Sequence, residues 1–118
     1  MKYLTLIKEI QSDKLRDDEL IDCLDIPHNF VLSNAIKKIV KKKLCNQDIV
    51  SKLEKISSLT AKENKLMGIY TVGHLAIAAL YFLDHPISRD KYKELYINLS
   101  EWDKEIIEKL TTGDPFLD

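Results

Sequence analysis

The residues best suited to metal binding or nucleophilic chemistry in this chain are three histidines and two cysteines: His28, His74, His85, Cys23 and Cys45. None of them belongs to a C-x-x-C or H-E-x-x-H motif. A structural zinc site needs four ligands that converge on one point, and the spacing of these residues does not indicate such a set. His74 and His85 would share a face only if one helix continued to Pro86. The sequence therefore predicts no metal site.

A cysteine nucleophile would require Cys23 to act with His28. The neighbours of Cys23 are acidic, which raises the pKa of a thiol and disfavours the reactive thiolate. The chain has no G-x-S-x-G motif. Its grouped carboxylates, at 17–19 and 103–108, are typical of a helix N-terminus and a solvated helix face. We therefore expect neither catalysis nor a cofactor, and two free thiols in a reducing compartment.

The lysines are the obvious alternative binding groups. The net charge of the 118 residues is only -1, but residues 31–65 carry nine lysines against three acids, and both flanking parts are acidic. Lys37, Lys38, Lys41 and Lys42 are candidate phosphate-binding residues. The cluster contains no arginine and no interleaved aromatic residue, so a solvated helix face is the competing interpretation. A nucleic-acid-binding or repair-like protein that uses lysines between 37 and 55 remains an alternative function.

The elements that must position these residues are helical. Apolar residues recur at helical spacing in most of the chain, and no segment alternates with period two for long enough to form a strand. The first segment places Tyr3, Leu4, Leu6, Ile7 and Ile10 at helical spacing. We predict an all-α fold of roughly seven helices in one domain, residues 1–118. The expected segments are 2–11, 16–25, one from about 28, one after Asn46, 60–83, one capped by Ser88, and one from Ser100 to Gly113.

The segment 66–83 carries no charge until Asp84. Thr60 and Glu63 form a capping-box pattern that predicts a long helix from about 60 to 83. Eighteen uncharged residues lie at the lower limit for a membrane span, but the charged start and the amphipathic neighbours favour a central interior helix. Gly73 then allows close helix contact, and Gly73→Leu should destabilise the fold strongly.

One face of this expected helix carries Tyr70, His74, Ile77 and Tyr81. A core stripe in which His74 donates to a backbone carbonyl is the simpler interpretation. A partner-binding ridge is the other, because tyrosine supplies a large contact area at low entropic cost.

A pattern of apolar positions repeats along the chain. The segments LIDCL (20–24), IVSKL (49–53) and IIEKL (106–110) share it, and Leu32, Ala35, Ile39 and Val40 match Ile69, Val72, Ala76 and Ile77 at a constant offset of 37. Short amphipathic helices followed by longer buried ones, at this period, are typical of helical-hairpin solenoids. Residues 15–110 thus resemble a short HEAT-like repeat protein, which implies an α-α superhelix of about three hairpins.

In size and in its lack of catalytic motifs, the chain also resembles bacterial immunity proteins, which block a cognate toxin. The resemblance implies a cytoplasmic protein, monomer or homodimer, that occludes its partner, for instance in contact-dependent growth inhibition. The residues that this hypothesis assigns to partner binding are Tyr92, Tyr96, Trp102 and Phe116 as anchors, and Asp103, Glu105 and Glu108 as charges that attract a basic nuclease toxin. An assembly adaptor is a further alternative.

Overall fold

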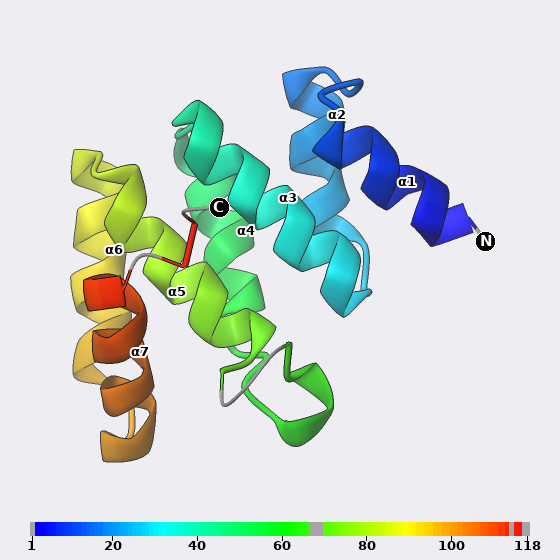
Figure 1. The fold of residues 1–118 in the computed structure, drawn as a ribbon. Helices are drawn as coiled ribbons and strands as arrows, with labels where there is room; N and C mark the ends of the chain where they lie inside the picture. The colour runs from blue at the N-terminus through cyan, green and yellow to red at the C-terminus, as the bar shows by residue number, and fades with distance from the viewer. Residues whose placement is uncertain (1, 67–69, 114, 117–118) are drawn as a thin grey trace.

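The computed structural model describes residues 2–66, 70–113 and 115–116, and these residues fold as an all-α protein (Figure 1). Extended pairing within the described residues is limited to one isolated bridge between Lys65 and Thr71. The helices of the described residues are α1 (Lys2–Gln11), α2 (Asp17–Asp22), η1 (Cys23–Asp25), α3 (Asn29–Lys42), α4 (Gln47–Ile56), η2 (Lys62–Asn64), α5 (Val72–Leu83), α6 (Pro86–Ile97) and α7 (Glu101–Gly113). The predicted fold class, all-α with roughly seven helices, is confirmed.

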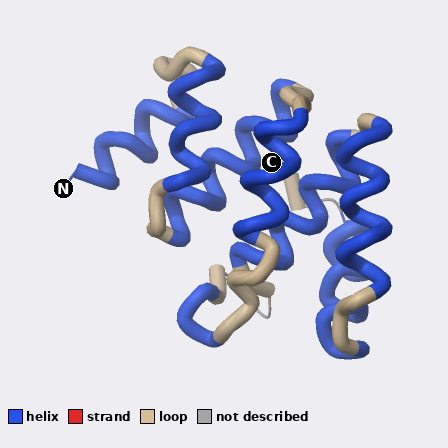
Figure 2. Tube along the Cα trace, turned by 180° about the vertical axis from the view of Figure 1, so that it is seen from behind, coloured by secondary structure: helices blue, strands red, loops and turns tan. Residues whose placement is uncertain are grey.

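The helices form two layers, and helices along the chain belong alternately to one layer and the other. In one layer α3 contacts α1 and α5, and α5 contacts α7; in the other layer α4 contacts η1 and α6. Across the layers, α4 and α6 pack on α5, and α2 packs on α3. In Figure 1 this order runs from α1 at one end of the molecule to α6 and α7 at the other. Figure 2 shows that most connections are short and that the longest one joins α4 to α5.

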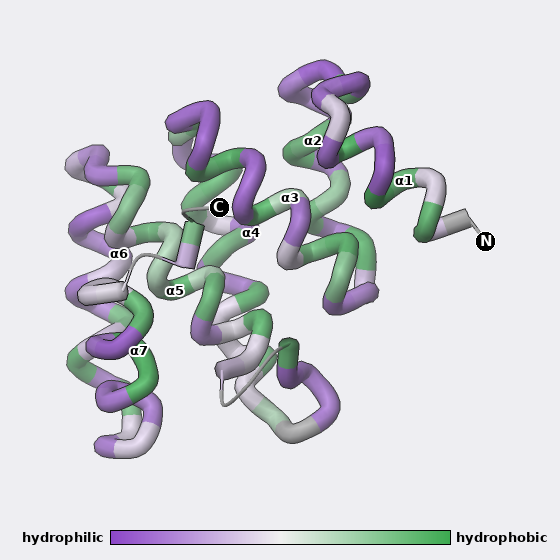
Figure 3. The backbone as a smooth tube through the Cα atoms, in the orientation of Figure 1, coloured by the Kyte–Doolittle hydropathy of each residue, from purple (hydrophilic) through white to green (hydrophobic). Residues whose placement is uncertain are grey.

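The centre of the molecule is α5. It contacts α3, α4, α6 and α7, and its residues from Val72 to Leu80 are all buried. Figure 3 shows the hydrophobic residues along α5 and on the sides of the helices around it, whereas hydrophilic residues lie mainly on the outer turns. The expectation of an interior helix is therefore confirmed. Among the described residues, no helix combines the length and the apolar character needed to cross a bilayer.

The predicted start of this helix was wrong. Thr60 is not its N-cap; α5 begins at Val72 and is capped by Thr71, whose hydroxyl accepts a hydrogen bond from the His74 amide at 3.3 Å. The backbone before it makes the short η2 turn and the Lys65–Thr71 bridge instead. The predicted repeat offset of 37 residues between α3 and α5 also fails at the helix starts. It aligns the start of α3 with residue 66, whereas α5 begins at Val72. Gly68 and Ile69 lie outside the described residues.

Gly73 allows the α4–α5 connection to contact α5 directly. A Cβ atom at this position would lie 2.6 Å from the Leu59 carbonyl oxygen and 2.9 Å from that of Ser57. The Gly73 amide also donates to the Leu59 carbonyl at 2.9 Å. The predicted close approach is therefore present, but its neighbour is the backbone that follows α4 rather than a facing helix.

The other helix starts follow the sequence more closely. His28 and Asn46 precede α3 and α4, and the Asn46 side chain accepts from the Ile49 amide at 2.9 Å. The expected cap of α6 was wrong by one turn: His85 is the N-cap, and Ser88 lies inside the helix with its hydroxyl bonded to the His85 amide at 3.1 Å. Pro86 occupies the first turn, where its missing N–H costs nothing.

Candidate functional site

His74 lies at the centre of a buried polar network. The Thr71 amide donates to Nδ1 of the imidazole at 3.0 Å, so in the neutral ring the proton is on Nε2. Nε2 donates to the Asp103 carboxylate at 2.7 Å, and the Ser100 hydroxyl donates to the second oxygen of that carboxylate at 3.0 Å. The network therefore joins the N-terminus of α5 to the N-terminus of α7. The prediction that His74 donates to a backbone carbonyl was wrong, since the acceptor is a carboxylate.

The order hydroxyl, imidazole, carboxylate resembles the composition of a nucleophilic triad, because the Thr71 hydroxyl lies 2.9 Å from His74 Nδ1. A nucleophile must reach a substrate, and Thr71 and His74 are each only 2% exposed. The same hydroxyl also accepts the His74 amide as a helix cap. We conclude that this network fixes α7 against α5 and does not present a reactive group.

The expected aromatic ridge is part of the interior. Tyr70 precedes α5, and His74 and Ile77 are buried. Tyr81 is half-buried, with the Arg89 guanidinium 4.2 Å from its ring centre and the ring of Tyr92 at 5.2 Å. The core interpretation of this stripe thus holds for its helical residues.

The residues predicted to bind a partner are divided by the structure. Trp102 is 60% exposed on α7, and Glu105 is exposed on the same helix. Phe116 is only 6% exposed and its ring contacts that of Phe82 at 5.4 Å, so it does not offer a surface anchor. Asp103 is engaged by His74.

The two tyrosines of α6, Tyr92 and Tyr96, are held by contacts within the protein. The rings of Tyr92 and Tyr96 stack at 5.8 Å, and the Tyr96 hydroxyl donates to Glu108 at 2.6 Å. The Glu108 carboxylate raises the pKa of Tyr96 to about 12, while burial raises the pKa of Tyr92. Tyr96 and Glu108 therefore serve first as a link between α6 and α7.

The four candidate phosphate-binding lysines are likewise separated. Lys38 pairs with Asp13 at 2.9 Å and Lys42 with Asp17 at 2.5 Å, so both are neutralised, one by the α1–α2 connection and the other by the first residue of α2. The hydrogen bond from Lys38 holds the pKa of Asp13 below its usual value. Lys37 makes no ion pair or hydrogen bond with any residue the structure describes. The lysine face of α3 is therefore not a uniform basic surface.

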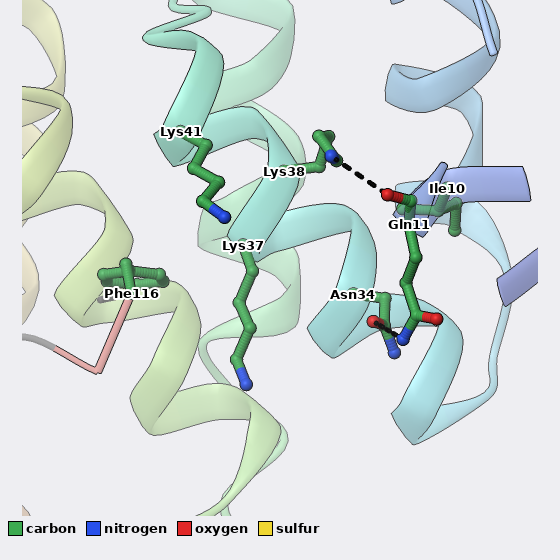
Figure 4. Close-up of a pocket in the computed structure, with 7 residues that line it drawn as sticks. All are labelled: Ile10, Gln11, Asn34, Lys37, Lys38, Lys41 and Phe116. Carbon is green, nitrogen blue, oxygen red and sulfur yellow. Dashed lines mark hydrogen bonds between the residues drawn. The ribbon is translucent and has the colours of Figure 1, made fainter. Parts of the chain in front are cut away.

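A hollow of about 310 Å³ opens beside this face, between α1, α3 and Phe116. Its lining residues are Ile10, Gln11, Asn34, Lys37, Lys38, Lys41 and Phe116. In Figure 4, Lys37 and Lys41 extend along α3 between Phe116 and Gln11, whereas Lys38 turns away to the Gln11 carbonyl. Three lysines and no acidic residue line this hollow, so it is cationic.

An exposed apolar surface at the opposite end from α7 was not predicted. Leu4 is 54% exposed and Phe30 56% exposed, and both line a hollow of about 440 Å³ with Tyr3, Ile7 and His28. Of the five apolar α1 residues at helical spacing, Tyr3 and Leu4 are exposed, and Ile10 is the one that is fully buried. The sequence signal was the position of Phe30 in the first turn of α3, outside the apolar stripe.

The remaining reactive groups are in protected settings. Both cysteines are free thiols. Burial, followed by the charge of Asp22, raises the pKa of Cys23, and burial raises the pKa of Cys45. In the part of the chain that the structure describes, no three histidine, cysteine or acidic side chains come together as metal ligands.

Comparison with known proteins found no protein-family model, no curated protein and no solved structure that matches the chain.

Proposed function

We propose that the chain is a non-enzymatic module that binds one protein partner, and that its helices form an α-α superhelix of about three HEAT-like hairpins. The two-layer order of alternate helices supports the architecture. The binding role is carried by one observation: Trp102 is 60% exposed on the terminal helix α7 and makes no ring contact with the described residues. Burying such a ring on a partner is the usual way in which an aromatic residue becomes an energetic hot spot.

The partner in this proposal is a toxin, and the chain is its immunity protein. Trp102 would fill an apolar pocket near the toxin's active site, and the exposed Glu105 would attract a basic surface around it. Ile97, which is also exposed, adds apolar area at the end of α6. Occlusion of this kind needs no chemistry from the inhibitor, which agrees with the burial of Thr71 and His74 in the polar network.

The test begins with the genes beside this one, and the absence of any toxin-like domain there would contradict the immunity function. Where such a domain is encoded, its direct binding is measured by calorimetry, together with rescue of growth when the two proteins are co-expressed. Trp102→Ala should weaken binding by about 30-fold or more and abolish rescue. Phe30→Ala is the matched control, because it removes an equally exposed aromatic ring at the other end of the molecule. If Trp102→Ala binds as tightly as Phe30→Ala, α7 is not the binding surface. If the neighbouring domain does not bind at all, the immunity function is wrong.

A second candidate is binding of nucleic acid, and the specific observation in its favour is the convergence of Lys37, Lys38 and Lys41 around one hollow. Phosphate contacts are strongest at low salt. Absence of any binding to duplex DNA or RNA in low-salt buffer would end this candidate.

A further inference from the structure

An apolar hollow of about 440 Å³ lies between α1 and the start of α3. The His28 ring contacts that of Tyr3 at 4.6 Å and that of Phe30 at 6.2 Å between ring centres, so three rings line one concave surface. Leu4 and Ile7 complete its apolar lining. The volume is within the range of ligand-binding sites, and exposed apolar groups gathered in this way are typical of an interaction surface.

The hollow contains one polar group that the fold leaves available. The Val31 amide donates to Nδ1 of His28 at 3.4 Å, so in the neutral ring the proton is on Nε2. Within the described residues, this Nε2–H group has no hydrogen-bond acceptor. The Asn34 amide, by contrast, accepts from Gln11 and donates to the Phe30 carbonyl. The hollow therefore favours an occupant that is largely apolar and carries a hydrogen-bond acceptor.

The charge around the apolar hollow is positive. The exposed Lys8 lies one helical turn after Leu4 on α1, and Lys37 lies one turn after Asn34 on α3. Neither lysine forms an ion pair with another described residue. Glu9, the acidic residue of α1, lines a separate hollow beside α2. An acidic occupant is therefore favoured, whereas a second copy of this chain would bring two positive rims together.

The chain itself shows an aromatic residue of an acidic segment on the neighbouring part of this face. Phe116 packs on Phe82 of α5 and borders Lys37 of α3 (Figure 4). It belongs to the sequence DPFLD (114–118), in which an acidic residue stands at each end. Because α3 packs on α5 and on α1, the apolar hollow is the counterpart of this contact at the α1 side. A concave site of this kind suits an inserted side chain better than a planar bilayer surface.

We propose that the apolar hollow binds an aromatic residue of an acidic peptide segment in a partner protein. The aromatic ring of the segment contacts Leu4 and Phe30, and one of its carbonyl groups accepts a hydrogen bond from His28 Nε2. Its carboxylates face Lys8 and Lys37. The site lies at the opposite end of the molecule from α7. It therefore does not depend on the proposed capture of a toxin by α7, and either can fail without the other.

The experiment is an NMR titration of the ¹⁵N-labelled whole chain with the peptide acetyl-DPFLD-amide at low salt. We expect a dissociation constant of about 1 mM or lower, with amide shifts confined to α1 and the start of α3. The peptide acetyl-DPALD-amide should bind at least about tenfold more weakly, and acetyl-KPFLK-amide should not bind detectably. Shifts centred on Phe82 would show that the peptide displaces Phe116 instead, and they would overturn the proposal.

Leu4→Ala and Phe30→Ala should each weaken binding of acetyl-DPFLD-amide at least about tenfold. Lys37→Gln should weaken it about threefold, and this difference should shrink as salt is added. Trp102→Ala is the matched control, because it removes an equally exposed aromatic ring at the other end of the molecule. Thermal melting of each variant checks that the fold is retained.

Binding that is absent, that is equal for the alanine peptide, or that falls equally in Trp102→Ala would overturn the site. Two further measurements test the other occupants of this face. Sedimentation of the chain with phosphatidylglycerol vesicles, lost in Phe30→Ala and without any peptide binding, would assign the face to a lipid surface. A dimer in analytical ultracentrifugation that Leu4→Ala dissociates would assign it to a second copy. Either result would contradict the peptide site.

Discussion

Replacing Gly73 by alanine should destabilise the protein even though alanine is the better helix former. The new Cβ would lie 2.6 Å from the Leu59 carbonyl oxygen, and an ordinary contact needs at least 3.4 Å. The two backbone segments would have to separate by about 0.8 Å, because closely packed interiors have no free volume to absorb the methyl group. Such overpacking costs about 1–3 kcal/mol. Weakening the hydrogen bond from the Gly73 amide to Leu59 adds about 1 kcal/mol.

Alanine returns about 1 kcal/mol through its helix propensity, so we expect a net loss of about 1–3 kcal/mol in the free energy of unfolding. The assay is urea denaturation followed by far-UV circular dichroism. Gly113→Ala is the matched control, because a Cβ at Gly113 meets nothing within 4 Å. It should be neutral or slightly stabilising. Equal stability of the two variants would refute the close approach of α5 to the α4–α5 connection.

Three further results are expected. His74→Ala and Asp103→Ala should each lower the free energy of unfolding by about 1–3 kcal/mol in denaturant titrations, because the first leaves the buried Thr71 amide without its acceptor and the second leaves Nε2 of the buried His74 without one; wild-type stability in both would show that the network does not hold α7. Phe116→Ala should lower the free energy of unfolding by about 3 kcal/mol, whereas Trp102→Ala should change it by no more than about 0.5 kcal/mol. Thermal melting can measure this contrast. The Tyr96–Glu108 bond raises the pKa of the phenol from 10.0 to about 12, so its stabilising contribution is present below pH 10 and is lost as pH rises from 10 to about 12. In an ultraviolet titration of the folded protein, Tyr96→Phe should remove the tyrosinate signal near pH 12, and persistence of that signal would assign it to another tyrosine.

The helices with strong apolar periodicity and standard caps were predictable from the sequence. α1 has the predicted bounds, and α4 starts after Asn46 as expected. The start of α5 was not predictable by the same rules. Thr60 and Glu63 fit the capping-box pattern, whereas Thr71 is followed by His74, which that pattern does not include. Tertiary contacts decide between Thr60 and Thr71 as the start of the helix. Thr71 is buried where α5 packs on α7 and on the α4–α5 connection.

The candidate site was less predictable than the fold for a physical reason. Helical spacing identifies which face a residue occupies, but not which neighbour neutralises it. Each lysine of α3 carries the same positive charge and looks alike in the sequence. In the structure, Asp13 and Asp17 pair with Lys38 and Lys42 respectively. The partners come from the segment after α1, so the cationic hollow is defined by how α1 packs on α3 and not by the lysine pattern itself.

Histidine is what the sequence reading underestimated, because each of the three imidazoles accepts a backbone amide at a helix N-terminus. Nδ1 of His28, His74 and His85 accepts from Val31, Thr71 and Ile87 respectively. His28 and His85 are the N-caps of α3 and α6, so their imidazoles take the role usual for serine, threonine, aspartate or asparagine. His74 is the third residue of α5, where its imidazole takes the role of the glutamate in a capping box.

The capping role can be separated from packing at His85, which is exposed and precedes α6. His85→Ala should lower the free energy of unfolding by about 1 kcal/mol, whereas His85→Asn should retain it, because an asparagine carbonyl can accept the Ile87 amide in the same way. Denaturant titrations of the two variants against the wild type measure the difference. If alanine and asparagine are equally destabilising, the imidazole stabilises α6 by contacts that an amide cannot make. If both are neutral, the helix start depends on Pro86 and on the bond between the Ser88 hydroxyl and the His85 backbone.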